Sequence, residues 1–327
     1  MNTFLSSYNG TSPSPIGFYI TAFHTLENKN YLIFALSVIY ILTMLGNLLV
    51  LVVLFLNPSL HNPKYIAVCN LAVVDISMNS VIIPQMVPVF VFNLNVISFG
   101  ACFSQMFFMH FFGGMESFSL AILSYDRLVA ICFPLRYQTI NTNIRMFVIL
   151  AVVWAIAFFL EIYPVALASQ LSYCASRIVR SCCCEHGPVY ILACGDTSFN
   201  RKLATTKTLI VLFSPLSFIV LTYIIIVIAV LKIASVEQRR KAFSTCFTHM
   251  LLVLIYYLPV ILAYILGNLR LISSPDLLTA ILTVSVTLPP MLNPIIYSLK
   301  TEELREKIMK LIRLHKISPA LKQTAIT

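Results

Sequence analysis

Asp126 and Arg127 are the residues whose type and position most invite chemistry, because an acid and a base directly follow a long apolar stretch. At the end of a helix in a soluble protein, such a pair is an ordinary solvated ion pair. Asp126 lies 24 residues after Cys102, however, and a helix of that length extends roughly 36 Å, enough to cross a bilayer with some tilt. We therefore place the pair at one mouth of a membrane-spanning helix, where the two charges can neutralise each other.

Asp75, Glu116 and Lys207 are further ionisable residues that fall inside apolar stretches. A charge at mid-membrane costs about 2.5–3.5 kcal/mol on insertion scales, so such groups are usually paired, protonated or functional. One interpretation of the two acids is a protonated carboxyl that is hydrogen-bonded to a neutral neighbour. The candidate neighbours are Asn47, Ser117 and Asn293. Lys207 should either face a cavity or snorkel outward, and both alternatives stay open.

The composition indicates what kind of element must position these residues. The chain has 327 residues, of which 59% are hydrophobic and 10% charged, and its mean hydropathy is +0.90. A soluble protein needs far more charge on its surface, so we predict a membrane protein. The net charge of +10 comes mainly from residues that flank apolar segments. Since no basic run is interleaved with aromatic residues, we predict no nucleic-acid partner.

Hydropathy predicts seven membrane spans, all helical, since a helix satisfies its own backbone in lipid. The predicted spans cover residues 31–55, 65–92, 101–133, 146–168, 203–231, 242–266 and 277–299. Residues 301–313 have apolar positions at helical spacing and a basic remainder, which predicts a helix along the membrane surface. The predicted fold class is thus an all-α membrane protein, a seven-transmembrane helix bundle with a short amphipathic eighth helix.

The charges of the loops predict the orientation. Twelve basic residues lie in the loops on the Asp126 side and in the C-terminal segment, against six on the opposite side, which makes the first side cytoplasmic. Asn9-Gly10-Thr11 is a glycosylation sequon and is consistent with an outer N-terminus. We predict an extracellular tail over residues 1–30, a seven-helix domain over 31–300, and an amphipathic helix with a cytoplasmic tail over 301–327.

Cysteines gather in the segment between the fourth and fifth spans. They are Cys174, Cys182, Cys183, Cys184 and Cys194. Disulfides are the favoured interpretation, because the segment lies on the predicted outer, oxidising side. A zinc cluster is the alternative, but three consecutive cysteines do not comfortably ligate one ion, and no histidine is suitably spaced.

Motifs spread along most of the chain resemble those of rhodopsin-like G-protein-coupled receptors. They are Gly46-Asn47, Leu71 with Asp75, Asp126-Arg127-Leu128, Trp154, Pro215 with Tyr223, and Asn293-Pro294-Ile295-Ile296-Tyr297. A narrower resemblance is to the olfactory receptors. It is carried by the segments that begin at Leu60, Ser124, Lys241 and Pro290, namely LHNPKY, SYDRLVAIC, KAFSTCFTH and PMLNP. The chain departs from that family at Lys64, Leu128 and 256–258, which we interpret as marks of a divergent branch, with an aquatic vertebrate as a hypothesis.

The resemblance implies roles for the inner half of the bundle. It implies that the chain couples to a heterotrimeric G protein of the olfactory stimulatory type and raises cyclic AMP. The residues it implies for coupling are Asp126, Arg127 and Tyr223, and those for the activation switch are Asn293, Pro294 and Tyr297. The basic cluster Arg239, Arg240 and Lys241 opens the sixth span on the same face and suits an acidic partner surface, and anchoring on the cytoplasmic side alone is the other interpretation. The resemblance also implies a bound sodium ion at Asp75 and Glu116 as the alternative to protonation, and no other cofactor.

The outer half would then hold the ligand. The resemblance implies the disulfides Cys102–Cys184 and Cys174–Cys194, which leaves Cys182 and Cys183 unassigned and able to compete for Cys102. A pocket in a helix bundle is expected between the outer parts of the third, fifth, sixth and seventh spans. The candidate residues are Met109, His110, Gly113, Lys207, Thr208, Val260 and Tyr264. One hypothesis is that Lys207, together with His110, binds an anionic odorant.

Other function classes find less support in the sequence. The two halves show no inverted repeat, which argues against a transporter. No His-Glu-x-x-His, no Gly-x-Ser-x-Gly and no paired aspartates in adjacent spans are present, so we predict no enzyme. A receptor for a lipid or peptide is the remaining alternative. We expect a plasma-membrane receptor of sensory cilia that contacts an odorant, a G protein and the bilayer.

Overall fold

Seven helices long and apolar enough to cross a membrane form the body of the protein, and they confirm the predicted spans. The computed structural model describes residues 17–21, 23, 29–92, 94–174, 176–268, 271, 274–311 and 313. The long helices are α1 (Lys29–Leu56), α2 (Pro63–Val91), α3 (Phe99–Cys132), α5 (Asn143–Ser169), α7 (Ser198–Leu231), α8 (Val236–Asn268) and α9 (Pro275–Lys300). The largest difference in bounds is at α8, which begins six residues before the predicted 242, because hydropathy misses the polar first turns of a helix.

Short side chains cap the starts of four of these helices. Asn62, Ser98, Thr142 and Ser274 each accept a hydrogen bond from the backbone N–H three residues later, at α2, α3, α5 and α9. Such caps satisfy one of the N–H groups that a first turn leaves free. The connections contain α4 (Tyr137–Ile140), α6 (His186–Tyr190), and the 3₁₀ turns η1 (Pro58–Leu60) and η2 (Pro134–Arg136).

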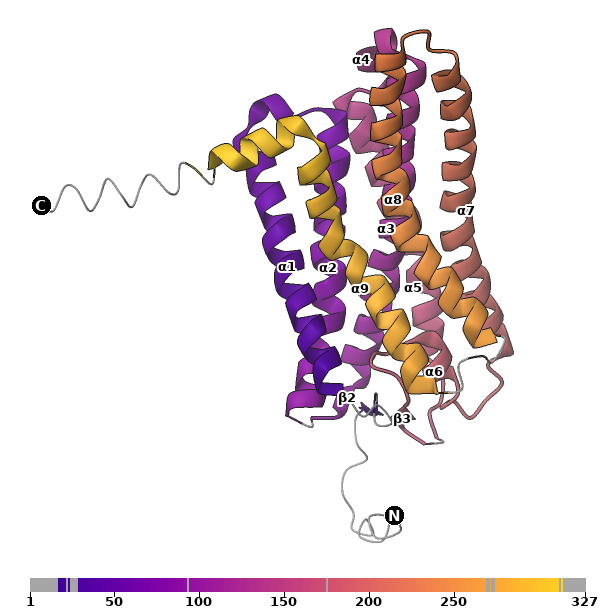
Figure 1. The fold of residues 1–327 in the computed structure, drawn as a ribbon. Helices are drawn as coiled ribbons and strands as arrows, with labels where there is room; N and C mark the ends of the chain where they lie inside the picture. Colours follow the sequence, from indigo (N-terminus) through magenta and orange to yellow (C-terminus); the bar gives the residue numbers. More distant parts are fainter. Residues whose placement is uncertain are drawn as a thin grey trace, which may run out of the picture.

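A small sheet lies at the end of the bundle that also carries α6, opposite the end with α4 (Figure 1). Its strands are β1 (Gly17–Ile20), β2 (Val96–Ser98) and β3 (Ile178–Val179). β1 pairs with β2 antiparallel and with β3 parallel, so the sheet joins three distant segments. A Cβ at Gly17 would lie 2.0 Å from the carbonyl oxygen of Ile97, so glycine alone fits this contact. The predicted all-α class omits this sheet, because strands this short carry no periodic signal.

Residues 302–311 form the predicted eighth helix, which turns away from α9 at the opposite end of the bundle (Figure 1). Leu304 and Ile308 are buried against the core, and the Tyr65 hydroxyl donates a 2.9 Å hydrogen bond to Glu303. We call this end, which also carries α4, the inner end, and the end with the sheet and α6 the outer end. Asn9 and residues 314–327 lie outside the described residues, and the predicted limits of the two tails stay predictions.

α3 runs through the middle of the bundle and contacts α2, α5, α7 and α8. Its buried side chains extend from Cys102 to Val129, whereas large apolar side chains such as Phe55 and Phe159 are exposed on the outer faces of α1 and α5. An apolar exterior is what contact with lipid requires. α1 approaches α9 closely at Gly46, where an added Cβ would lie 2.9 Å from Pro294.

Candidate functional site

A cavity of about 160 Å³ lies in the outer half of the bundle. Its wall includes six of the seven predicted ligand residues: Met109, His110, Gly113, Lys207, Thr208 and Val260. The seventh, Tyr264, belongs to α8, but its side chain is outside the described part of the structure. α9 also lines the cavity, as expected of the seventh span, although none of its residues was predicted, and the contributions of α2, α5 and the segment before α6 were not predicted at all. The wall residues from these segments include Ile82, Glu161, Cys182, Cys183, Glu185 and Thr283.

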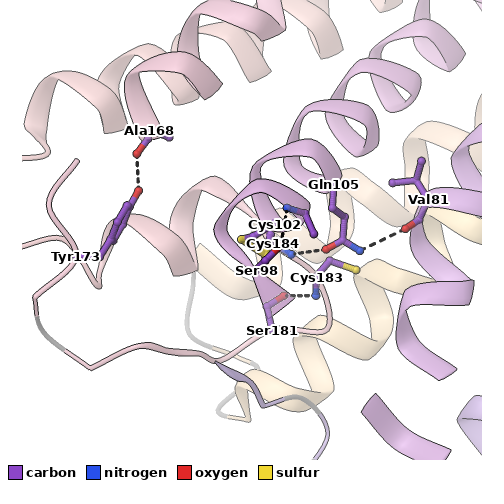
Figure 2. Close-up of a disulfide and its surroundings, with 10 residues drawn as sticks. Val81, Ser98, Cys102, Gln105, Ala168, Tyr173, Ser181, Cys183 and Cys184 are labelled. Atoms are coloured by element: carbon purple, nitrogen blue, oxygen red, sulfur yellow. Dashed lines mark hydrogen bonds between the residues drawn. A yellow bond between two sulfur atoms is a disulfide. The ribbon is translucent and has the colours of Figure 1, made fainter. Parts of the chain in front are cut away.

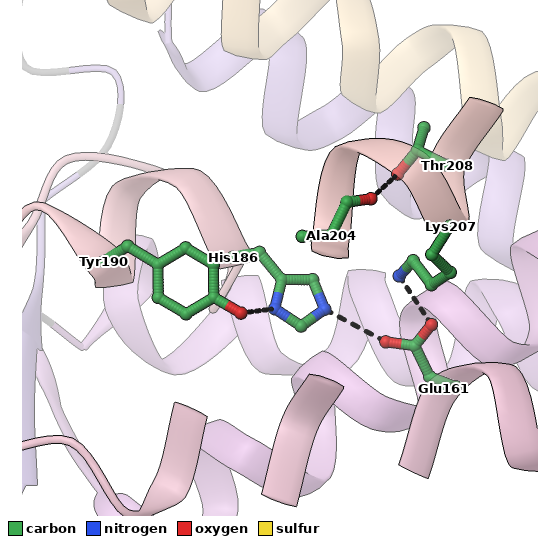
Figure 3. A network of polar contacts seen from close by, with 6 residues as sticks. All are labelled: Glu161, His186, Tyr190, Ala204, Lys207 and Thr208. Carbon is green, nitrogen blue, oxygen red and sulfur yellow. Dashed lines mark hydrogen bonds and ion pairs between the residues drawn. The ribbon is translucent and has the colours of Figure 1, made fainter. Parts of the chain in front are cut away.

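Lys207 points into the bundle and does not snorkel. Its side chain is 5% exposed, and its Nζ lies 2.6 Å from Oε2 of Glu161 on α5 (Figure 3). Glu161 is itself 3% exposed. Glu161 is thus a further buried acid, beside Asp75 and Glu116, and it has a basic partner. The signal that could have found it is an acid inside the span 146–168, since such a group requires a partner.

His186 extends this ion pair into a chain of hydrogen bonds. Its Nε2 lies 3.1 Å from Oε1 of Glu161, and its Nδ1 lies 3.0 Å from the Tyr190 hydroxyl (Figure 3). A neutral ring satisfies both contacts if Nε2–H donates to Glu161 and Nδ1 accepts from Tyr190. Burial also lowers the pKa of His186, which favours the neutral ring. The chain connects α6 to α5 and α7.

Two disulfides anchor the segment that covers the cavity. They join Cys102 to Cys184 and Cys174 to Cys194, the pairs that the family resemblance implies. Beside the first, the Cys184 N–H donates to Gln105, whose amide in turn donates to the Val81 carbonyl of α2 (Figure 2). The segment is thereby held against α3 and α2.

Cys182 and Cys183 are free and buried. Their sulfur atoms are 3.3 Å apart, and that of Cys182 lies 3.2 Å from the Thr283 hydroxyl. Neither competes with Cys184 for Cys102 in this structure. Among the described residues, no group of three His, Cys, Asp or Glu side chains could hold a metal ion, which leaves the zinc alternative without support.

Asp126 and Arg127 do not form the expected ion pair. Asp126 accepts hydrogen bonds of 2.6 Å from the Tyr137 hydroxyl and 2.9 Å from the Asn141 amide, and none of the ion pairs between described residues includes Arg127. The physical reason is that adjacent residues on a helix do not face each other. Asp126 is turned toward the segment that contains α4.

Arg127 instead lines a second cavity, of about 480 Å³, at the inner end. Tyr297 and His249 line the same cavity, and the Tyr297 hydroxyl is buried without a hydrogen-bond partner among the described residues. The predicted Tyr223 lies close by, with its hydroxyl 2.9 Å from Nδ1 of His249. Arg240 is exposed and Arg239 half-buried in the first turns of α8, where the side chain of Lys241 is not described.

The buried acids Asp75 and Glu116 differ in their partners. The Asn293 amide donates hydrogen bonds of 3.0 and 3.1 Å to the two oxygens of Asp75. Asn293 is one of the three neutral neighbours that the sequence offered as partners. Both carboxyl oxygens of Glu116 are buried without a partner among the described residues. Uncommitted carboxyl oxygens suit a hard cation, so these residues fit a sodium ion as well as a proton.

Comparisons with known proteins agree with this architecture. Residues 36–315 match the family model of the olfactory receptors. The chain is similar to olfactory receptor 10A6 of Homo sapiens, with 37% identity over 88% of this chain and 91% of that protein. It is also similar to olfactory receptor 52K1 of Homo sapiens, with 35% identity over 93% of this chain and 98% of that protein. Olfactory receptor 1f45 of Rattus norvegicus is 34% identical over 94% and 97% of the two chains. The chain therefore belongs to the olfactory receptor family, which makes it a multi-pass G-protein-coupled receptor of the plasma membrane and not an enzyme.

Proposed function

We propose that this receptor binds a small odorant in the outer cavity and activates an olfactory stimulatory G protein, which raises cyclic AMP. The observation that carries the proposal is a cavity with apolar walls and a few buried polar groups, the usual character of a small-molecule site. Its volume of about 160 Å³ is below the roughly 300–1,000 Å³ of most ligand pockets. That size favours an odorant over a peptide or a lipid.

Activation would shift the receptor between two states according to the difference in the ligand's affinity for them. Arg127 is a suitable contact for the G protein, because none of the ion pairs between described residues engages it and it lines the inner cavity. Arg239, Arg240 and Lys241 at the start of α8 supply further positive charge for an acidic partner surface. The proposed orientation has an extracellular N-terminus, glycosylated at Asn9, and a cytoplasmic C-terminus, in the membrane of sensory cilia.

A cyclic AMP assay in cells that express the olfactory stimulatory G protein tests the proposal. The cells are exposed to an odorant panel, and surface receptor is quantified with an N-terminal tag. Gly113→Val should abolish the response, because Gly113 lines the cavity and added methyl groups would fill it. Gly100→Val is the matched control, since Gly100 lies on the same helix and faces open space. If Gly113→Val responds like the wild type at equal surface level, the odorant binds elsewhere.

We also propose that Asp75 and Glu116 hold a sodium ion. Both acids are buried, and the uncommitted oxygens of Glu116 could accept a cation. Replacing sodium with choline at constant ionic strength should then lower the melting temperature of the purified receptor. Glu116→Gln should remove this sodium dependence. A melting temperature that does not change with the cation would leave the protonated carboxyls as the explanation.

A further inference from the structure

The charges that line the outer cavity do not cancel. Glu161, Glu185 and Lys207 are the acidic and ammonium side chains in its wall. Lys207 is committed to Glu161 at 2.6 Å, so this pair contributes no net charge. Glu185 remains as one excess carboxyl group. Within the described parts of the chain, the cavity wall therefore holds a carboxyl group without a matching cation.

Glu185 stands directly before α6 and is half-buried. Its Oε1 accepts a 2.9 Å hydrogen bond from the Ser181 hydroxyl. None of the ion pairs between described residues includes Glu185. Burial raises the pKa of this carboxyl group, which means that its charged form is costly without a counter-ion. A cation that enters the cavity would offset this cost.

His110 supplies a second uncommitted group. Its Nε2 is buried without a hydrogen-bond partner among the described residues. Its ring stacks on that of His186, with 4.9 Å between centroids, and His186 follows Glu185 directly in the sequence. Because both nitrogens of His186 are already used, by Glu161 and Tyr190, His110 is the imidazole that can still bind a ligand.

We infer that the cavity recognises a small alkyl amine in its ammonium form, with one N–H donated to the carboxylate of Glu185 and another to Nε2 of His110. An ammonium group has several donors and no acceptor, which suits a carboxylate and an imidazole lone pair together. The apolar tail would lie against Met109, Ile82 and Val260. We expect a carboxylate odorant to bind more weakly than the amine, because Lys207 is already neutralised by Glu161. This inference rests on the proposed function of the cavity as the odorant site.

The test compares a straight-chain amine, alcohol, aldehyde and carboxylic acid of equal chain length on the full receptor. Cyclic AMP in cells is one readout, and the ligand-induced rise in melting temperature of purified receptor is the other. The amine should be the most potent of the four. Glu185→Gln keeps the acceptor for Ser181 but removes the charge, and it should raise the half-maximal amine concentration at least about tenfold. Asp196→Asn, in an exposed acid of the same connection, is the control and should change nothing.

The outcomes separate this inference from the proposed function. An amine that raises the melting temperature and loses that effect in Glu185→Gln supports the inference, even without cyclic AMP, in which case the coupling proposal fails. Responses to the alcohol or aldehyde but not to the amine overturn the inference and leave the odorant proposal in place. An unchanged amine response in Glu185→Gln also overturns the inference. If none of the four ligands binds or signals, both proposals are refuted.

Discussion

Replacing Glu161 with leucine should strongly destabilise the receptor, because two buried groups depend on its carboxylate. Lys207 places its Nζ 2.6 Å from one oxygen, and His186 places its Nε2 3.1 Å from the other. Leucine is apolar and can satisfy neither. The variant would leave an ammonium group that is 5% exposed without its acidic partner inside the outer half of the bundle.

The magnitude follows from the geometry. Two unit charges 2.6 Å apart attract each other by about 6 kcal/mol at an effective dielectric constant of about 20. The desolvation of both charges offsets much of this, whereas removing one partner of a buried pair typically costs about 3–5 kcal/mol. The orphaned N–H of His186 adds about 1–3 kcal/mol. Lys207→Met should cost less than Glu161→Leu, since Glu161 keeps its hydrogen bond to His186.

A double-mutant cycle measures this coupling. Thermal unfolding of the purified receptor can be followed with a thiol-reactive fluorophore, because Cys182, Cys183 and Cys246 are buried and free. The variant that combines Glu161→Leu and Lys207→Met should be more stable than Glu161→Leu alone, since no buried charge then lacks a partner.

Lys202→Met is the matched control, because Lys202 is an exposed lysine on the same helix. It should change the free energy of unfolding by no more than about 0.5 kcal/mol. Strictly additive effects of the two substitutions at Glu161 and Lys207 would refute the reasoning. So would a Lys207→Met variant as stable as the wild type, because that result would mean that Lys207 is solvated.

Three further predictions concern other parts of the chain. Tyr137→Phe removes the 2.6 Å hydrogen bond to buried Asp126 and should cost about 1–3 kcal/mol, which a fall in melting temperature would show. Cys102→Ser should cost about 2–5 kcal/mol and abolish surface expression, whereas Cys69→Ser, at a half-buried free thiol, should be expressed normally. Acidification should destabilise the wild type as the pH falls through about 6.5, because burial lowers the pKa of His186 and the unfolded chain then binds a proton that the folded one does not. His186→Gln should weaken this pH dependence, and an identical pH profile would contradict it.

The number and course of the membrane helices could be predicted from the sequence, because hydropathy is a local property and lipid leaves helices as the simple solution. The Asp126-Arg127 motif also located the inner end of α3 correctly, since both residues lie near the end of that helix, Phe99–Cys132. Its resting contacts could not be predicted in the same way. Asp126 is bonded by Tyr137 and Asn141, and this contact depends on how α4 folds back against α3.

Most of the residues predicted for the ligand do line the cavity, since their depth along each span can be counted from the sequence. The sequence does not say which way a helix faces. Whether Lys207 snorkels or pairs was open from the sequence alone. The position of Glu185 in the cavity wall, outside the ion pairs between described residues, could not be predicted from the sequence. Both depend on contacts between segments that are far apart in the chain.

The sequence by itself thus determined the membrane class, the seven spans and the family, each of which rests on local composition or on short motifs. Only the tertiary structure decided that Lys207 on α7 meets Glu161 on α5, 46 residues away, and that α6 adds His186 to the pair. The physical reason is that a buried charge constrains its surroundings to supply a partner but does not specify which helix supplies it. That choice follows from the packing and rotation of whole helices.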